Sequence, residues 1–208
     1  MTATVPTVFV VDDDPPLRRS LHAMLVAAGL QTQTYPSARD FLAEFDPQQP
    51  GCLVLDLLLR GGENGLELLR NLQARPVHPP VIVLTGHGSV PTSVQALRGG
   101  AIDFIEKPLR PAALIARIRE AIDIDARERD TRGHHQAVHE RARRLSARER
   151  QIAALLMEGK RSKEIATTLG ISVRTVEGYR ARLLHKMQAE SAAHLVTMLL
   201  VNDVKLRT

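Results

Sequence analysis

Four polar motifs in the first half of the chain each follow a short apolar run, and together their side chains could handle a phosphoryl group. The motifs are VVDDD, LVLDL, VLTG and FIEKP, which contribute Asp12, Asp13, Asp56, Thr85 and Lys107. In an open α/β sheet, the carboxyl ends of the strands meet at one crevice, where ligands bind. The motifs therefore predict one site that binds a divalent cation, phosphorylates an aspartate and holds the phosphoryl group.

Each side chain has a chemical role in such a site. Asp12, Asp13 and Asp56 offer the hard oxygen ligands that Mg²⁺ takes, and the cation would offset the repulsion between them. Bound Mg²⁺ would bring a phosphodonor to Asp56 and stabilise charge in the transition state. The Thr85 hydroxyl can donate to a phosphoryl oxygen, and the Lys107 ammonium can pair with the carboxylate or the phosphoryl group. The Lys-Pro bond that follows is a candidate cis peptide, which would aim Lys107 inward.

Taken alone, single motifs have plainer interpretations. The acidic run Asp12–Asp14 could be a turn with a helix N-cap, and Asp56 could be ordinary loop polarity. The four motifs in this order and spacing favour the phosphorylation site over these interpretations.

The segments that carry the motifs alternate between strand and helix patterns. Short apolar or β-branched runs predict strands at residues 8–11, 31–35, 52–57, 81–84 and 101–105. Helical periods follow each of them, starting at Pro15, near Phe41, and over residues 65–73, 90–97 and 111–124. Continuous apolar strands imply a parallel sheet that is covered on both faces. We therefore expect an α/β domain with a five-stranded, parallel, doubly wound (flavodoxin-like) sheet over residues 1–124.

The rest of the chain has only helical patterns. Residues 125–144 are rich in charged residues and histidine, which predicts a helical linker that Gly133 could interrupt. From residue 145 to 208 we expect an all-α domain, with helices at 147–158, 162–169, 173–187 and 190–202. Ser146 and Glu149 form a capping box before the first of these helices. The two helices that meet near Gly170, with Ser172 as N-cap of the second, are typical of a helix-turn-helix.

Charge and composition fit this division. Residues 1–125 carry 11 basic and 14 acidic residues, whereas residues 126–208 carry 17 basic and 9 acidic residues. A basic second half indicates nucleic acid as partner, although a basic linker helix would explain much of the excess. Cys52 lies in an apolar run and predicts a buried thiol in a reducing compartment. No signal peptide and no membrane-spanning run is found, so we expect a cytoplasmic protein without membrane contact.

Residues 1–124 resemble the receiver domain of two-component response regulators. The residues that carry this resemblance are the acid pair, Asp56, Thr85 and Lys-Pro. The stretch TGHGSVP…GGAIDFIEKP is similar to the FixJ branch of that family. The resemblance implies that a histidine kinase phosphorylates Asp56, and that Asp12 and Asp13 hold Mg²⁺ with the Leu58 carbonyl as a further ligand. It also implies that Thr85 and Lys107 sense the phosphoryl group. Phe104 takes the place of the family's aromatic switch residue, although a phenylalanine taken alone is more often a core residue.

The chain departs from the receiver pattern after Asp56. The family usually has Met-Pro and a short loop to glycine, whereas this chain reads DLLLRGGENG, with Leu59-Arg60 in place of Met-Pro and a loop one residue longer. Without the proline, and with Gly61-Gly62, this loop should be more mobile. The departure puts the metal affinity and the lifetime of the phosphate in question.

Residues 145–208 resemble the LuxR-type DNA-binding domain, through L-S-x-R-E, K-E-I-A, I-S and T-V-E. The resemblance implies that five residues touch backbone phosphates: Lys163, Arg174, Thr175, Arg180 and Lys186. It places three residues nearest the bases: Glu177, Gly178 and Ala181. Gly178 and Tyr179 depart from the usual bulkier residue and histidine, which leaves the base preference open. Arg182 fits a DNA contact and a solvated helix face equally well.

These features predict a DNA-binding transcription regulator that is controlled by phosphorylation. Phosphate on Asp56 would change the face around residues 90–123, and a homodimer or release of the second domain would then raise DNA affinity. Double-stranded DNA, a histidine kinase and RNA polymerase are the expected partners, and the chain would only accept and slowly hydrolyse its own phosphoryl group. Two alternatives remain: a Mg²⁺-dependent aspartyl-phosphate phosphatase, and a constitutive DNA-binding protein with a vestigial receiver.

Histidines outside these motifs suggest weaker hypotheses. His135 and His139 have the i,i+4 spacing of metal ligands, with His134 beside them, but no cysteine or paired carboxylate accompanies them, which favours a solvated linker face. His87 follows the Thr85 motif and could tune the access of water.

Overall fold

The computed structural model describes residues 4–59, 64–86 and 90–206 of the 208-residue chain. The chain falls into two compact units, Met1–Arg129 and Asp130–Thr208. Among the described helices, none offers the length of apolar surface that crossing a bilayer requires.

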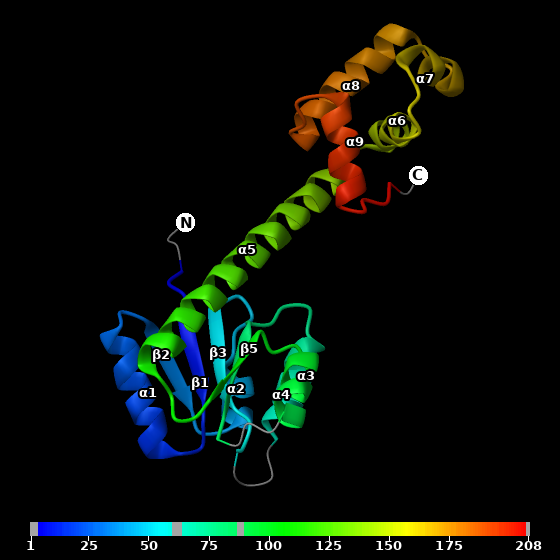
Figure 1. The fold of residues 1–208 in the computed structure, drawn as a ribbon. Coiled ribbons are helices and arrows are strands. Elements are labelled where there is room, and N and C mark those ends of the chain that lie inside the picture. Colours follow the sequence, from blue (N-terminus) through cyan, green and yellow to red (C-terminus); the bar gives the residue numbers. More distant parts are fainter. Residues whose placement is uncertain (1–3, 60–63, 87–89, 207–208) are drawn as a thin grey trace. The chain divides into compact units, whose positions relative to one another are not determined.

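The first unit contains a parallel sheet (Figure 1). Its five strands lie in the order β2-β1-β3-β4-β5. The strands are β1 (Thr7–Val11), β2 (Gln31–Tyr35), β3 (Gly51–Asp56), β4 (Val81–Thr85) and β5 (Asp103–Glu106). The three central strands are buried along their whole length, as their continuous apolar sequences require, and the edge strands β2 and β5 are partly exposed. The predicted five-stranded, doubly wound sheet is confirmed.

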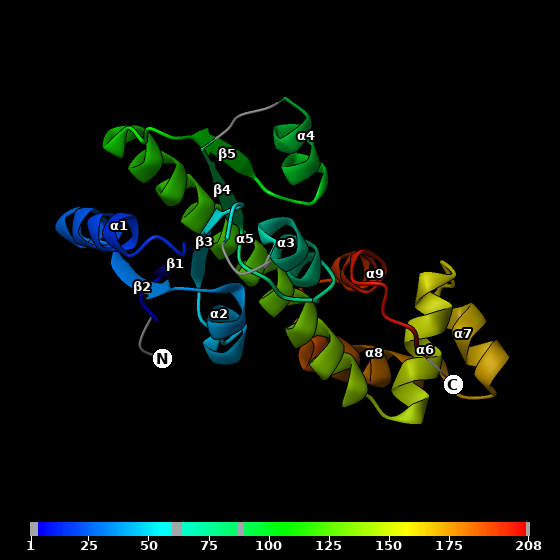
Figure 2. The same ribbon diagram turned by 90° about the horizontal axis from the view of Figure 1, so that it is seen from below.

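Helices cover both faces of this sheet (Figure 2). One face carries α1 (Pro15–Ala27) and the first part of α5 (Pro111–Arg143), and the other carries α2 (Ala38–Glu44), α3 (Gly65–Gln73) and α4 (Val90–Arg98). Side chains alternate along β1, so Val8 and Val10 pack in the core under α1 and α5. Phe9 and Val11 pack in the opposite core, with side chains of α2 and α3.

The second unit is helical throughout its described elements. It contains the end of α5 and the helices α6 (Ala147–Met157), α7 (Ser162–Leu169), α8 (Val173–Met187) and α9 (Ala192–Val201). Its core holds fully buried side chains from each of these later helices, among them Ile152, Ile165, Val176, Leu183 and Leu195. The all-α second domain predicted from the sequence is confirmed.

The turn between α7 and α8 has the predicted helix-turn-helix form. Gly170 ends α7 with a φ of 63°, a left-handed conformation that glycine adopts without steric cost. The backbone N–H of Ile171 donates to the carbonyl of Ala166 at 3.1 Å, and the Ser172 hydroxyl accepts from the Thr175 N–H at 3.1 Å. These two bonds satisfy backbone groups at the end of α7 and the start of α8.

The sequence left open whether Gly133 interrupts the linker helix, and it does not, because α5 is one continuous helix of 33 residues. A single glycine in a helix costs only about 1 kcal/mol relative to alanine. Beyond Gly133, Val138 and Ala142 of the same helix are buried in the core of the second unit, which favours continuation. The helix therefore includes both the residues predicted as the last receiver helix and those predicted as linker.

The start of the predicted linker packs on the first unit through Asp125. This carboxylate is 1% exposed and accepts hydrogen bonds from the Gly51 backbone N–H (2.8 Å) and the Arg129 Nε (2.7 Å). The Arg129 guanidinium also donates to the carbonyls of Gln48 and Gln49 at 3.1 and 2.8 Å. Asp125 and Arg129 thus join α5 to the segment that enters β3.

Asp125→Ala should lower the free energy of unfolding by about 2–3 kcal/mol, because the mutation leaves a buried N–H and a guanidinium without their acceptor. Asp123→Ala is the matched control, since Asp123 is an exposed acid on the same helix and should change the value by less than about 0.5 kcal/mol. Urea unfolding followed by circular dichroism measures both. Equal effects of the two mutations would contradict the proposed anchor.

Candidate phosphorylation site and nucleic-acid interface

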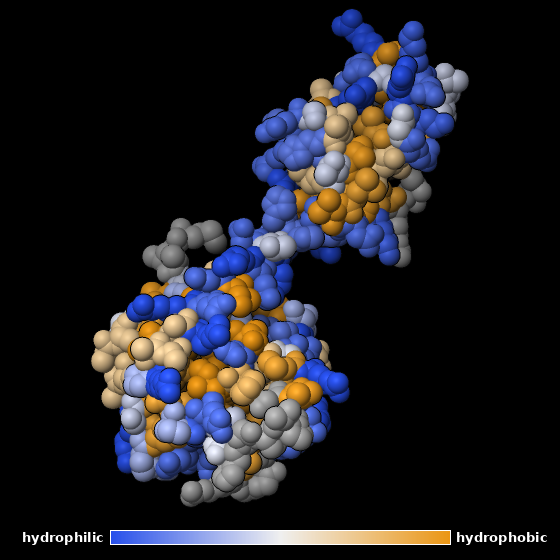
Figure 3. Space-filling model, in the orientation of Figure 1, coloured by the Kyte–Doolittle hydropathy of each residue, from blue (hydrophilic) through white to orange (hydrophobic). Residues whose placement is uncertain are grey.

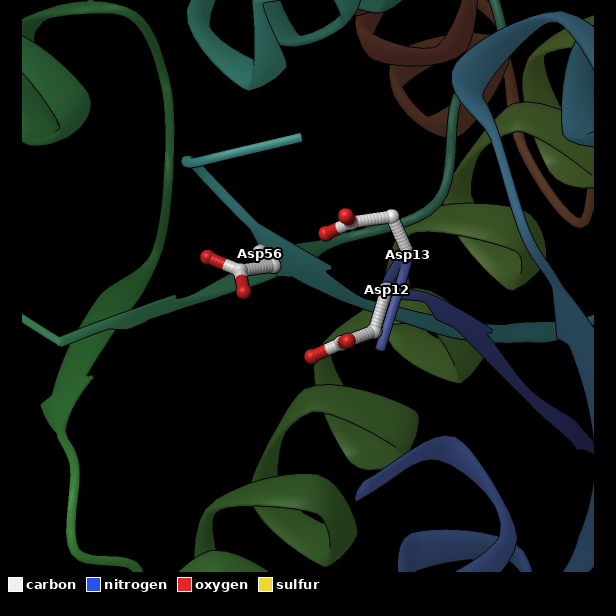
Figure 4. A group of neighbouring side chains, drawn as sticks. All are labelled: Asp12, Asp13 and Asp56. Carbon is white, nitrogen blue, oxygen red and sulfur yellow. The ribbon is translucent and has the colours of Figure 1, made fainter. Parts of the chain in front are cut away.

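The parallel sheet brings the polar motifs of the first unit to one edge. Asp12 and Asp13 follow β1, Asp56 ends β3, Thr85 ends β4, and Lys107 follows β5. These four strands are successive neighbours in the sheet. One carboxylate oxygen of each of the three aspartates lies within 4.8 Å of the other two, and Figure 4 shows the three side chains directed to the same side. The predicted cluster is therefore assembled by the fold.

Lys107 joins two of the carboxylates. Its Nζ donates to Asp56 Oδ2 at 2.7 Å and to Asp12 Oδ2 at 3.2 Å. The other oxygen of each carboxylate accepts from a backbone N–H, Asp12 from Asp14 at 2.8 Å and Asp56 from Leu58 at 3.0 Å. The peptide bond between Lys107 and its proline is cis, as the sequence suggested. Both carboxylates are thus held in place by two donors each.

Burial and charge shift two pKa values at this site. Removal of water raises the pKa of the fully buried Asp12, against the opposing effects of the Asp14 N–H and of Lys107. Burial alone would lower the pKa of Lys107, but its hydrogen bond to Asp56 and the charge of Asp12 outweigh this and raise it. Lys107 is therefore a cation at neutral pH, in contact with the Asp56 carboxylate.

The donor set fits a hard divalent cation. Asp12, Asp13 and Asp56 present only carboxylate oxygens, with neither nitrogen nor sulfur ligands among them, as Mg²⁺ prefers. Asp12 and Asp56 are buried, whereas Asp13 is partly buried. Leu58 is largely exposed, and its backbone N–H already bonds Asp56.

Thr85 and Phe104, the two other predicted receiver residues, have different environments. The Thr85 side chain is 3% exposed at the end of β4, and its carbonyl accepts from the Lys107 N–H at 2.8 Å. Phe104 on β5 is 37% exposed, so it is not a core residue, and the plainer interpretation of this phenylalanine is wrong. Arg60, Gly61, Gly62 and His87 lie outside the described residues.

The second unit presents an exposed polar face on α8. Arg174, Thr175, Glu177, Gly178 and Ala181 are exposed, as is Lys163 on α7. The opposite side of α8 is buried in the core through Val176, Leu183 and Met187. Seven of the eight residues predicted to contact DNA are exposed, because Lys186 is exposed as well. A Cβ at Gly178 would meet no atom within 4 Å, so α8 does not require glycine there.

Two of the residues predicted to contact DNA, Arg180 and Lys186, make ion pairs inside the unit. The Lys186 Nζ donates to Glu149 Oε2 at 2.8 Å, and the Glu149 side chain is 3% exposed. Arg180 bonds the Ser162 hydroxyl and lies 3.3 Å from Glu177. The sequence showed Glu149 as a capping-box residue but not its partner, and Ser162 was not singled out at all.

Arg182 and the histidines complete the positions named from the sequence. The Arg182 guanidinium lies 4.5 Å above the centre of the Tyr179 ring, a cation–π contact on the surface of α8. A metal site of this kind needs at least three acidic, histidine or cysteine residues whose ligand atoms lie close together. Within the described part of the chain, the aspartate cluster meets this condition and the linker histidines do not.

Comparisons with known proteins identify the families of both units. Residues 8–119 match the family described as response regulator receiver domain, and residues 143–199 match bacterial regulatory proteins of the luxR family. The transcriptional regulatory protein FixJ of Azorhizobium caulinodans is 44% identical, over 95% of this chain and 93% of that protein. The C4-dicarboxylate transport transcriptional regulatory protein DctR of Rhodobacter capsulatus is 43% identical, over 92% and 98%. The solved structure of response regulator StyR has 36% identity and a TM-score of 0.85, over 95% and 99%.

Lys186→Met should lower the free energy of unfolding by about 2 kcal/mol at pH 7, because it leaves the buried Glu149 carboxylate without its cation. Burial acts to raise the pKa of Glu149, but bonds from Lys186 and Ser146 outweigh this and lower it. The stabilisation is therefore complete above the pKa of an unfolded glutamate and is lost as the pH falls through the lowered pKa of the folded state. Urea titrations at several pH values measure this.

Lys163→Met is the control for this experiment, since Lys163 is an exposed cation on α7. It should leave the unfolding free energy within about 0.5 kcal/mol of the wild-type value at every pH. A difference between Lys186→Met and wild type that does not shrink at low pH would contradict the role of the ion pair.

Proposed function

The chain belongs to the two-component response regulators that join a receiver domain to a LuxR-type DNA-binding domain, and on that premise we propose that Asp56 carries its phosphoryl group. It is a transcriptional regulator under phosphorylation control. The single observation that carries the assignment to Asp56 is its contact with Lys107, at 2.7 Å, beside two further aspartates. We also propose that residues 1–124 act as receiver, 125–144 as linker and 145–208 as DNA-binding domain.

The acceptor step uses groups that the fold already holds in place. An Asp56 oxygen forms a bond to phosphorus while the bond from phosphorus to a histidine nitrogen of the kinase breaks, and the electron pair of that bond stays on the imidazole. Lys107 contacts Asp56 and Asp12 in the unphosphorylated chain, and after transfer it would pair with the negatively charged phosphoryl oxygens. The Thr85 hydroxyl would donate to a phosphoryl oxygen, and Phe104 would respond at the surface of β5.

Asp12, Asp13 and Asp56, with the Leu58 carbonyl, would hold Mg²⁺. When bound, the ion stabilises negative charge on the phosphoryl oxygens and orients the phosphodonor. The support for this is the all-oxygen donor set within 4.8 Å. Slow hydrolysis of its own phosphoryl group, and no other reaction, is the activity that we propose for the receiver.

Phosphorylation would favour a homodimer through the face around residues 90–123. Apolar side chains on and beside α4 and β5 are exposed, namely Val94, Leu97, Ile102 and Phe104. Figure 3 shows hydrophobic residues among hydrophilic ones on the surface of this unit. A shift of about 100-fold in the dimer equilibrium requires about 2.7 kcal/mol. One phosphoryl group with a few charge-assisted hydrogen bonds is sufficient for that.

The regulated partner would be double-stranded DNA, read by α8 in the major groove. Exposed basic residues on α7 and α8, such as Lys163 and Arg174, would contact backbone phosphates. A two-fold dimer would match paired half-sites and could present the bound protein to RNA polymerase. We place this activity in the cytoplasm, where the kinase and the DNA are accessible together.

Incubation of the full chain with acetyl phosphate and Mg²⁺ should add one phosphoryl group and shift the protein toward a dimer. Intact-mass spectrometry and sedimentation of the same sample measure the two effects. Asp56→Asn should abolish labelling because it removes the nucleophilic oxygen, and Asp13→Asn should weaken it because it removes a cation ligand. The label should also disappear when Mg²⁺ is chelated.

Three results would contradict the proposed function. Unchanged labelling of Asp56→Asn would mean that another residue accepts the phosphate. Labelling without any change of oligomeric state or DNA affinity would instead favour a vestigial receiver. Repeated turnover of phosphomonoesters would favour the phosphatase alternative.

Arg174→Ala should weaken binding to all DNA sequences alike and lower the slope of affinity against salt by about one unit, since it removes one phosphate contact. Arg39→Ala, which changes an exposed arginine of the first unit, should leave the slope unaltered. Fluorescence anisotropy at several salt concentrations measures both variants. A loss confined to one base position would mean that Arg174 reads a base.

A further inference from the structure

We propose that Glu177 selects a cytosine in the DNA site, and that Ser162 and Arg180 hold its carboxylate in the orientation that does so. The proposal rests on the proposed DNA-binding function and names the base chemistry that α8 recognises. It also gives a role to Ser162, a residue of α7 that no sequence motif indicated.

Glu177 is well placed to meet a base edge. It lies in the second turn of α8, next to the buried Val176, and its own side chain is 55% exposed. In helix-turn-helix proteins, residues near the N-terminus of the second helix contact bases in the major groove. The neighbouring Gly178 adds no side chain that could cover the carboxylate.

One oxygen of this carboxylate is fixed by two neighbours. Ser162 donates its hydroxyl to Glu177 Oε1 and accepts a bond from the Arg180 NH1. The same Arg180 nitrogen lies 3.3 Å from Glu177 Oε1. In the described part of the chain no hydrogen bond engages the second oxygen, Oε2. The network therefore orients the side chain while it leaves Oε2 for a partner.

Helix capping does not explain the serine. Ser162 is the first residue of α7, but Arg161 occupies the N-cap position, and its backbone N–H donates to the Glu164 carboxylate at 2.8 Å. The Ser162 hydroxyl bonds Glu177 and Arg180 of α8 instead. Its contribution is therefore to the relation between the two helices of the helix-turn-helix and to the orientation of Glu177.

The chemistry of the free oxygen specifies the base. A carboxylate only accepts hydrogen bonds, and its charge is repelled by the phosphates unless a cation accompanies it. Arg180 supplies that cation. Cytosine presents the N4 amino donor in the major groove, whereas guanine presents two acceptors there and thymine an acceptor and a methyl group. Adenine places its N7 acceptor beside its donor, which repels a carboxylate, so cytosine is the favoured base.

Fixing the side chain in advance makes this preference stronger. A glutamate that becomes ordered only on binding loses side-chain entropy. In this chain the Glu177 side chain is ordered in the absence of DNA, so less binding free energy is lost when DNA binds. A wrong base also meets a carboxylate that cannot rotate away from it. Arg180 accordingly acts through Glu177 as a positioning residue.

The test is selection from a randomised DNA library with the full chain, treated with acetyl phosphate and Mg²⁺. The wild type should require cytosine at one position of each half-site, with about tenfold discrimination against other bases. Glu177→Gln should change that position to adenine, because glutamine pairs with adenine N6 and N7, and should leave the other positions as they were.

The positioning role is tested by three further variants. Ser162→Ala should weaken discrimination at that one position several-fold, and Ser162→Thr, which keeps a hydroxyl, should restore it. Thr168→Ala is the control, because it removes an exposed hydroxyl of α7 whose hydrogen bond, among the described residues, goes to the carbonyl of Glu164. The control should select the wild-type site. Melting temperatures verify that all variants are folded at the temperature of selection.

The outcomes separate the proposals. An unchanged base for Glu177→Gln overturns Glu177 as the reader. A changed base for Glu177→Gln with no effect of Ser162→Ala overturns the positioning role of Ser162. If Ser162→Ala does not fold, Arg180→Lys replaces it, and retained discrimination in that variant overturns the network. A wild type that enriches no sequence overturns the proposed DNA-binding function itself.

Discussion

The contact of one lysine with two aspartates is the interaction on which the first unit depends. Lys107 lies between Asp12 and Asp56, which come from the ends of β1 and β3, while the lysine itself follows β5. Buried carboxylates are costly unless they are paired and hydrogen-bonded. The lysine and two backbone N–H groups meet that requirement in the protein alone, and a cation and a phosphoryl group would later join the same set of charges.

Charge compensation has two forms in the second unit, and they have different consequences. Glu149 is buried and paired with Lys186, so this pair joins α6 to α8. Glu177 and Arg180 are paired on the exposed side of α8, where among the described residues no hydrogen bond engages the second carboxylate oxygen. A basic residue of this unit therefore has to be judged by its partner, because sequence position alone does not separate a structural cation from a DNA contact.

Residues 125–144 have the composition of a linker, but packing near each end of this segment holds it in the helix α5. Asp125 and Arg129 attach its middle to the first unit, and Val138 and Ala142 are buried in the core of the second. A residue of low helix propensity, Gly133, lies between these two attachments. Tertiary packing outweighs the local preference at that point.

The sequence by itself determined the order and type of the elements and the members of the aspartate cluster. Apolar periodicity, turn glycines and capping residues act over a few residues, and parallel strands necessarily bring their carboxyl ends to one edge, so Asp56 and its neighbours could be found without coordinates. Only the tertiary structure decided the partners of Asp125, Lys186 and Glu177, which lie 74, 37 and 15 residues away in the chain. Such pairs leave no local pattern, because they depend on how helices and strands pack and not on the residues beside them.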